Sequence, residues 1–314
     1  MRTSGYDIIG DIHGHGSELE ALLQKLEYQI VDGAYRHQSR QALFLGDLID
    51  RGSENKKVVE TVRKMVQSGN AQCIMGNHEF NSIAYHTKNE SGQWVREHSE
   101  KNIKQHSAFT IEYNAQNQAD LDACLEFFKS LPLYLDLGEI RLIHACWHNE
   151  HIEKINAHLD DQRRLTDNAI QDGHKEGTVT FEASDVLLKG HEIQLQSGIE
   201  FTDKDDHVRT KMRTRWWINH PKNLGELSLM PEVMPMEHQE LPVHPDDIIG
   251  YSESAPALFI GHYWKKGEPL PIAKNVACVD YSMGKGRESG GNLVAYRWDG
   301  EGVLSAEKFI KLFE

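Results

Sequence analysis

Residues 6–14 read YDIIGDIHG and place an aspartate and a histidine two positions apart, directly after a short apolar run. The apolar run predicts a buried strand, and a helix is predicted behind it by the spacing of Leu19, Leu22, Leu23 and Leu26. Ser17, with Glu20 three residues later, predicts that this helix begins with a capping box. The stretch therefore predicts strand, glycine-rich turn and helix, the repeating unit of α/β folds, with Asp11 and His13 in the turn.

The same pattern recurs twice along the next 70 residues. Residues 41–47 (QALFLGD) and 71–75 (AQCIM) are predicted strands, and valines at helical spacing predict a helix between them. The strands lead into GDLIDRG at 46–52 and GNHE at 76–79. Because open α/β sheets collect their binding sites at the carboxyl ends of strands, we expect the three turns to face one crevice.

Further predicted strands lie later in the chain. EIRLIHACW (139–147), ALFIGH (257–262) and VACVD (276–280) place His144, His262 and Asp280 at or near strand ends, and GNLVAYRW (291–298) predicts an antiparallel strand. Residues between His144 and His262 lose this rhythm and become rich in proline. We therefore predict one domain from residues 1–147 and 256–314, with residues 148–255 as an inserted cap or lid.

Composition limits the class of protein. The formal charge of −14 argues against broad binding to nucleic acid or anionic lipid. The four cysteines have no CxxC spacing, so neither a disulfide framework nor a thiolate metal site is predicted. Without an 18-residue apolar run or a charged leader, the chain is expected to be cytoplasmic and not bound to a membrane.

The residues at the predicted strand ends are of metal-ligand type. Carboxylates, one amide oxygen and neutral imidazoles suit divalent Mn, Fe or Zn better than a thiolate site or an all-oxygen calcium cage. There are more ligands than one catalytic metal needs, and a carboxylate such as Asp47 can bridge two ions, so two ions are expected.

Taken in order, the three blocks GDIHG, GDLIDRG and GNHE resemble the signature of the calcineurin-like metallophosphoesterases. The GDxxDRG form is similar to the branch that holds phosphoprotein phosphatases and bacterial diadenosine tetraphosphatases. The resemblance is firm from residue 6 to 80, weaker at His144, His262 and Asp280, and absent across 148–255. It implies a four-layer αββα sandwich of two mixed sheets with a dimetal site at the strand ends, plus an inserted cap.

The resemblance also implies roles for individual residues. The first metal would be held by Asp11, His13 and Asp47, and the second by Asp47, Asn77, His144 and His262. The ions, Mn2+ and/or Fe with Zn or Ni as alternatives, would activate a bridging hydroxide. Arg51, with Asn77 and His78, would bind the phosphate, and His78, oriented by Asp50, would protonate the leaving oxygen.

The implied activity is hydrolysis of phosphomonoesters or nucleotide phosphoanhydrides, with small substrates such as diadenosine polyphosphates favoured. Met75 stands where protein phosphatases usually carry an arginine, which argues modestly against a serine/threonine phosphoprotein phosphatase, although a protein substrate stays open. A metal-binding scaffold is the alternative of another class. It is disfavoured because Asp50, Arg51 and His78 have no metal to bind in this scheme.

Two local alternatives remain open. Gly190-His191 follows an apolar run as Gly261-His262 does, so His191 competes with His262 as a ligand. The basic residues of HVRTKMRTRWW (207–217) would share one face of a strand, either meeting a polyanionic substrate or protecting a sheet edge.

Overall fold

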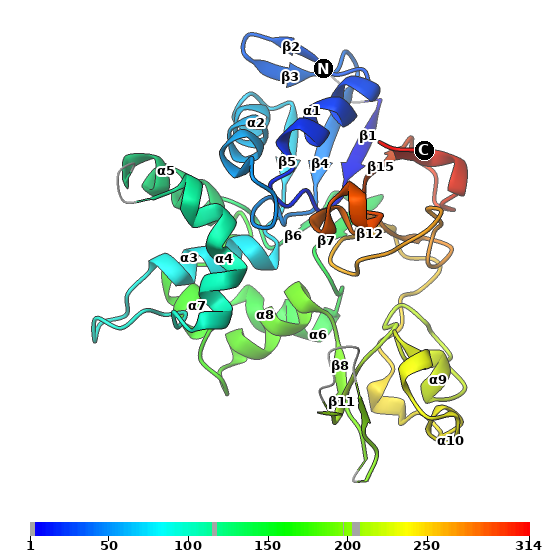
Figure 1. Cartoon of the computed structure of the whole chain (residues 1–314). Coiled ribbons are helices and arrows are strands. Elements are labelled where there is room, and N and C mark those ends of the chain that lie inside the picture. Colours follow the sequence, from blue (N-terminus) through cyan, green and yellow to red (C-terminus); the bar gives the residue numbers. More distant parts are fainter. Residues whose placement is uncertain (1–3, 115–117, 197, 203–207) are drawn as a thin grey trace.

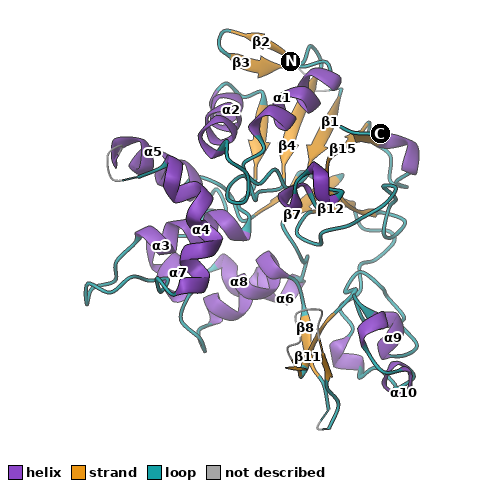
Figure 2. Cartoon of the chain, in the orientation of Figure 1, coloured by secondary structure: helices purple, strands orange, loops and turns teal. Residues whose placement is uncertain are grey.

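The computed structural model describes residues 4–114, 118–196, 198–202 and 208–314. Two sheets form its centre (Figures 1 and 2). The first sheet has the order β14-β15-β1-β4-β5, with β16 added beside β15. Its strands are β1 (Gly5–Ile9), β4 (Arg40–Phe44), β5 (Ala71–Cys73), β14 (Asp280–Tyr281), β15 (Asn292–Trp298) and β16 (Phe309–Lys311). The second sheet has the order β13-β12-β7-β6, from β6 (Tyr134–Asp136), β7 (Ile140–Ile143), β12 (Ala257–Ile260) and β13 (Val276–Cys278).

Both sheets are mixed. β1 runs parallel to β4 and antiparallel to β15, as predicted for residues 291–298. β12 runs parallel to its neighbours β7 and β13, whereas β6 is antiparallel to β7. The parallel strands β1, β4 and β5 are followed directly by the three glycine-rich turns, so these turns come out at one edge of the sheet.

Alternation along the strands produces four layers. Ile8 and Leu43 point inward and join Phe259 and Tyr296 in the core between the sheets. Their neighbours on the strands, such as Ile9 and Phe44, belong instead to a core that includes the apolar stripes of the covering helices. Helices α1 (Gly16–Lys25) and α2 (Asn55–Gln67) cover the first sheet (Figure 1). The expected αββα sandwich is therefore confirmed.

Among the described residues, six further helices lie along the chain between β5 and Gly190. They are α3 (Asn77–His86), α4 (Glu100–Glu112), α5 (Gln118–Lys129), α6 (Asn149–Asn156), α7 (Asp167–Asp172) and α8 (Val179–Lys189). α8 is attached to the end of β7, where the backbone N–H of Ala145 donates to the carbonyl of Leu187 over 3.1 Å. No helix among the described residues is long and apolar enough to cross a bilayer.

Residues 148–255 divide into two structural parts. Helices α6, α7 and α8 contribute residues such as Ile155 and Leu187 to the main helix-lined core. The described residues between 192 and 243 include a small apolar cluster of their own, around Met212 and Leu227, and project from the rest of the chain in Figure 1. Trp216 and Trp217 in this range belong instead to the helix-lined core. Their elements are β8 (Glu192–Gln194), β9 (Phe201–Thr202), β10 (Val208–Arg209), β11 (Lys211–Arg213), α9 (Leu224–Leu227) and α10 (Met236–Gln239). The boundaries of the cap at 148 and 255 stay a prediction.

The predicted cap of the first helix is wrong. Helix α1 begins at Gly16 after His15, so Ser17 lies inside its first turn. The Ser17 backbone N–H and hydroxyl both donate to the Glu54 carboxylate, at 2.8 and 2.9 Å. A carboxylate from the second glycine-rich turn thus supplies the cap that the local sequence suggested Ser17 would provide.

Candidate metal centre and active site

The first two glycine-rich turns are tied to each other by backbone hydrogen bonds. The N–H groups of Ile12 and His13 donate to the Asp47 carbonyl at 3.1 and 2.9 Å, and Gly52 N–H donates to the His13 carbonyl at 2.8 Å. His13 and Asp47 both have a φ of 49°, in the left-handed region that side chains other than glycine rarely adopt. These turns are held in a strained conformation that directs their side chains into one place.

Glu79 fixes the second turn to the third. Its carboxylate accepts hydrogen bonds from the backbone N–H groups of Asp47 and Leu48, both at 2.8 Å, and of Gly76 at 2.9 Å. Burial and the nearby Asp47 carboxylate raise the pKa of Glu79 to about 7. The hydrogen bond from the Leu48 N–H lowers this pKa but does not cancel the rise. Glu79 stands in the GNHE block but has no predicted role, because its three partners are backbone groups that no sequence pattern identifies.

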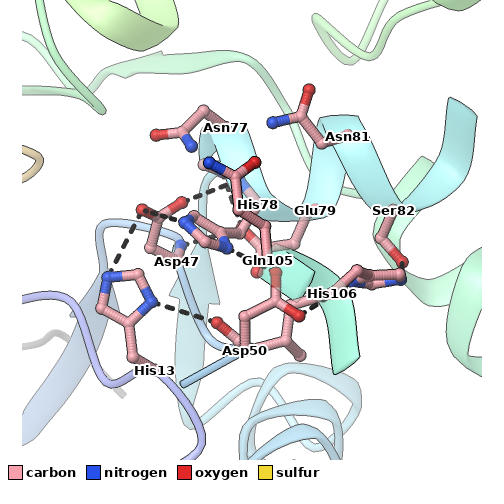
Figure 3. Close-up of polar contacts among 12 residues, drawn as sticks. His13, Asp47, Asp50, Asn77, His78, Glu79, Asn81, Ser82, Gln105 and His106 are labelled. Carbon is pink, nitrogen blue, oxygen red and sulfur yellow. Dashed lines mark hydrogen bonds and ion pairs between the residues drawn. The ribbon is translucent and has the colours of Figure 1, made fainter. Parts of the chain in front are cut away.

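Asp47 is the centre of the site (Figure 3). Its Oδ2 atom lies 3.4 Å from His144 Nε2, 3.7 Å from His13 Nε2 and 3.9 Å from His78 Nε2. Its Oδ1 atom accepts a hydrogen bond from the backbone N–H of His78 at 3.0 Å. One carboxylate thus joins two groups with the spacing of metal ligands: His13, Asp47 and His78, and Asp47, His144 and His262.

Asn77 brings the second group together. Its Oδ1 atom lies 3.1 Å from His144 Nε2 and 2.9 Å from His262 Nδ1. The other ring nitrogen of His144 lies 2.7 Å from the Leu45 carbonyl, which orients the ring. The amide oxygen, two imidazoles and the Asp47 carboxylate, all expected as ligands of one ion, therefore converge.

Asp11 lies at the same centre but outside the two tight groups. Its Oδ2 atom accepts from the His262 backbone N–H at 3.0 Å, and a Cβ on Gly261 would come within 2.1 Å of its Oδ1. Only glycine at 261 therefore leaves room for this carboxylate. Burial, and then repulsion from Asp280 and Asp47, raise the pKa of Asp11 well above its ordinary value.

The donor set fits divalent cations. Asp11 Oδ1, His13 Nε2 and His262 Nε2 are buried polar atoms with no hydrogen-bond partner. Burial lowers the pKa of His13 to about 4 and lowers that of His262 as well, so both rings are neutral with lone pairs available. Crowded carboxylates beside unpartnered imidazoles are the arrangement that a cation stabilises.

His78 and Asp50 form the pair that the sequence predicted. His78 Nδ1 lies 2.5 Å from Asp50 Oδ2, so the Nε2 side of the ring faces Asp47 and the cleft. Burial alone disfavours the His78 cation, but attraction to Asp47 and Asp50 outweighs it and raises the pKa of His78. The same attraction, with hydrogen bonds from two histidines, holds the pKa of Asp50 far below its ordinary value.

The second of these histidines, His106 on α4, was not found from the sequence. Its Nδ1 atom lies 2.8 Å from Asp50 Oδ1, so Asp50 is held between two imidazoles. His106 stands in the middle of a helix without a strand-end or glycine signal, so only the packing of α4 against the site reveals it.

A cavity of about 550 Å³ opens from the metal centre. Arg51 lies on one side of it, with its guanidinium carbon 5.4 Å from the centre of the Trp264 ring. The rest of the lining comes mainly from α3, α4 and their connection, together with Lys189 and Arg213, and includes Asn81, Arg96, Asn102 and Gln105. These last four residues, like His106, carry no recognisable pattern in the sequence.

His262, and not His191, lies with the metal-ligand residues. His191 Nδ1 contacts the Thr214 hydroxyl at 3.0 Å, and its ring lies 6.1 Å from that of His148.

Asp280 supports the backbone near the site. Its carboxylate accepts hydrogen bonds from the backbone N–H groups of Trp264 at 2.6 Å and Ser282 at 2.9 Å.

The expectation that the basic residues of 207–217 share one face of a strand holds only in part, because Lys211 and Arg213 are alternate residues of β11 but Arg215 lies beyond it. β11 ends at Arg213, which lines the cavity, whereas Arg215 donates to the backbone carbonyls of Ser228 and Gly225. Trp216 and Trp217, which follow Arg215, are buried. His207 lies outside the described residues.

Comparisons with known proteins agree with this geometry. Residues 6–211 match the calcineurin-like phosphoesterase family. The chain is 36% identical over 146 residues to a protein of Oceanobacillus iheyensis named bis(5'-nucleosyl)-tetraphosphatase PrpE [asymmetrical], a match that covers 44% of this chain and 54% of that one. The Bacillus subtilis protein of the same name is 29% identical over 160 residues, or 50% of this chain and 63% of that one. The aligned region thus spans little more than half the length of these relatives.

The fold also has a counterpart among solved structures. A protein serine/threonine phosphatase from Saccharomyces cerevisiae superposes with a TM-score of 0.51 at 13% identity, covering 99% of this chain and 79% of that one, which supports the fold alone. The family match extends over about two thirds of the chain and includes all three glycine-rich turns. The chain belongs to the calcineurin-like phosphoesterase family.

Proposed function

We propose that this chain is a metal-dependent phosphohydrolase that acts on nucleotide phosphoanhydrides of the dinucleoside polyphosphate type, and also on simple phosphomonoesters. The observation that carries the proposal is the convergence of two ligand groups on Asp47, with three buried ligand atoms left unpartnered beside them. The names of the relatives support the choice of substrate class.

Asp11, His13 and Asp47 would hold one ion, and Asp47, Asn77, His144 and His262 the other. Asp11 is assigned over His78 because the Nδ1 atom of His78 is already engaged by Asp50 and its ring faces the cleft. Two dications would supply an activated water and stabilise negative charge on the phosphate. Mn2+ and Fe suit this mixed oxygen and nitrogen set, with Zn or Ni as alternatives.

Arg51 is placed to bind the phosphate. No carboxylate of a described residue lies within ion-pair range of its guanidinium, which faces the cavity beside Trp264. A planar fork of N–H donors suits two oxygens of one phosphate, and a phosphate would supply the missing negative charge.

His78 would donate the proton to the leaving oxygen. Asp50 accepts from Nδ1, which leaves the proton on Nε2 directed into the cleft. The raised pKa of His78 favours the protonated ring that this role requires. Cationic side chains of the cavity would bind the negatively charged substrate, although the overall charge of the chain is −14.

The test is turnover by the Mn-reconstituted protein of three substrates: p-nitrophenyl phosphate, diadenosine tetraphosphate and a phosphopeptide. We expect hydrolysis of the first two, with the dinucleotide preferred. Absence of turnover with Mn, Fe, Ni and Zn would contradict the proposal, and a preference for the phosphopeptide would replace its substrate class. A cytoplasmic location stays a prediction.

A further inference from the structure

We propose that Arg96 binds a second phosphate group of the substrate, next to the one at the metal centre, so that the cleft selects chains of two or more phosphates over phosphomonoesters. The inference rests on the proposed function and names the residue that determines its substrate class. It concerns the wall of the cavity formed by α3, α4 and the residues between them, which we call the amide wall: Asn81, Arg96, Asn102 and Gln105.

Arg96 is held in place by amide oxygens. Its Nη1 donates to Asn81 Oδ1 at 2.7 Å, and its Nη2 donates to Asn102 Oδ1 at 2.9 Å and Gln105 Oε1 at 3.3 Å. These contacts orient the planar guanidinium without neutralising it, because an amide carries no net charge. They use at most three of its five N–H donors.

The positive charge of Arg96 has no carboxylate partner among the described residues, although the side chain is half-buried. Burial lowers the pKa of Arg96, and the nearby Asp50 carboxylate partly offsets that effect. A partly desolvated cation is costly unless an anion accompanies it. Two other cations of the cavity differ, since Lys189 lies 2.6 Å from Asp185 and Arg213 lies 3.6 Å from Glu192.

The amide wall begins one helical turn from the metal centre. Asn77 and Asn81 are four residues apart on α3, so they lie on one face of the helix about 6 Å apart along its axis. Figure 3 shows the side chains of Asn77, Asn81 and Gln105 extending to the same side of the His78 ring. A phosphate held at the metal centre would therefore have its neighbour in the phosphate chain within reach of Arg96.

The kinetic test compares Arg96→Gln and Arg96→Lys with the unaltered protein. Because a charged hydrogen bond to phosphate is lost, we expect kcat/KM for diadenosine tetraphosphate to fall about 10- to 100-fold in Arg96→Gln. Turnover of p-nitrophenyl phosphate should change by less than about twofold, because this substrate has no second phosphate. Arg96→Lys, which keeps the charge and loses the fork, should fall between the two.

The matched control is Arg164→Gln, which removes a surface arginine paired with Asp160 at 2.6 Å, outside the cavity. It should leave both substrates unaffected. Equal losses on the two substrates in Arg96→Gln would show that Arg96 only maintains the fold, and no loss on the dinucleotide would show that it binds no phosphate. Either result overturns the inference.

A binding measurement separates this inference from the proposed function. Calorimetric titration of the metal-loaded protein with inorganic tripolyphosphate and with orthophosphate requires no turnover. We expect Arg96→Gln to weaken tripolyphosphate binding about 10- to 100-fold and leave orthophosphate binding unchanged. If tripolyphosphate binding alone weakens but the unaltered protein hydrolyses no substrate, the proposed function is contradicted and the second phosphate site is supported. If the protein is active but Arg96→Gln affects both anions equally, the second phosphate site is contradicted and the proposed function is supported.

Discussion

The two walls of the cavity differ in residue type, burial and origin. The metal wall consists of residues that follow strand ends, mostly buried carboxylates and imidazoles: Asp11, His13, Asp47, Asn77, His144 and His262. Of these, Asp47, Asn77 and His262 line the cavity directly. The amide wall comes from helices and a connecting segment, and joins neutral amides to a half-buried arginine. The first wall is proposed to hold the metal ions. The second is proposed to determine which substrate is bound.

The largest expected effect comes from breaking the metal wall at its shared residue. Asp47→Asn removes the charge that lies between the His13 and His144 nitrogens. We expect at least about a 10⁴-fold fall in kcat/KM for every substrate, the scale seen when a central catalytic group is removed. Elemental analysis should show loss of bound metal in parallel. Activity within tenfold of the unaltered protein would mean that Asp47 does not bridge two ions.

The next largest effect is expected at His78, beside the metal wall, where catalysis can be separated from metal binding. His78→Asn removes the proposed proton donor, for which a fall in kcat of about 10²- to 10⁴-fold is expected. Metal content and thermal stability should stay near those of the unaltered protein, because Asp47, Asn77, His144 and His262 are untouched. A substrate with a very acidic leaving group should recover part of the rate. Loss of metal together with activity would instead make His78 a ligand.

A smaller effect is expected at Glu79, which holds the turns of the metal wall together. Glu79→Gln replaces one acceptor oxygen by a donor that would face backbone N–H groups. Leaving such buried donors unpaired costs about 1–3 kcal/mol of unfolding free energy, or roughly 2–5 °C in melting temperature for a chain of this length. Glu153→Gln, at an exposed position of α6, is the control and should leave the melting temperature unchanged. Equal melting temperatures for the two variants would show that Glu79 does not stabilise the turns.

The smallest effect concerns acid sensitivity beside the amide wall. His174 stacks on Phe80 with ring centres 4.3 Å apart, and its Nε2 lies 3.4 Å from Asn81 Oδ1. Burial lowers the pKa of His174 to about 4, below the ordinary value of 6.5. The unfolded chain therefore binds more protons between these values, and stability falls as pH falls through that window, by at most about 1.4 kcal/mol per pH unit.

His174→Gln removes this titrating group. Unfolding by urea at pH 7, 6 and 5 should show that the unaltered protein loses its stability advantage over the variant as the pH falls. A constant difference across the three pH values would mean that the pKa of His174 is the same in the folded and unfolded chains.

The same contrast explains what the sequence could predict. Asp11, Asp47 and Asn77 follow apolar strands at glycine-rich turns. This local pattern predicts that their side chains lie at the edge of the sheet. His144 and His262 required the further assumption that two distant strands share that edge, and the structure places both histidines beside Asp47.

Arg96, Gln105 and His106 could not be found in this way. They lie on a connection and a helix whose position against the site depends on tertiary packing, and a helical glutamine or histidine has no signature of its own. For Ser17 the local pattern predicted a role that the structure does not show. The residue matches a capping signal, but Glu54 accepts the hydrogen bonds at the start of the helix. Local patterns therefore predicted the metal wall and missed the amide wall.

The most direct test of the two-ion centre is the metal stoichiometry of the Mn-reconstituted protein at saturating supply, with anomalous scattering from crystals to place the ions. The geometry predicts two ions per chain, both in contact with Asp47, one also with Asp11 and His13 and the other with Asn77, His144 and His262. A single ion per chain, or two ions that do not share Asp47, would contradict it.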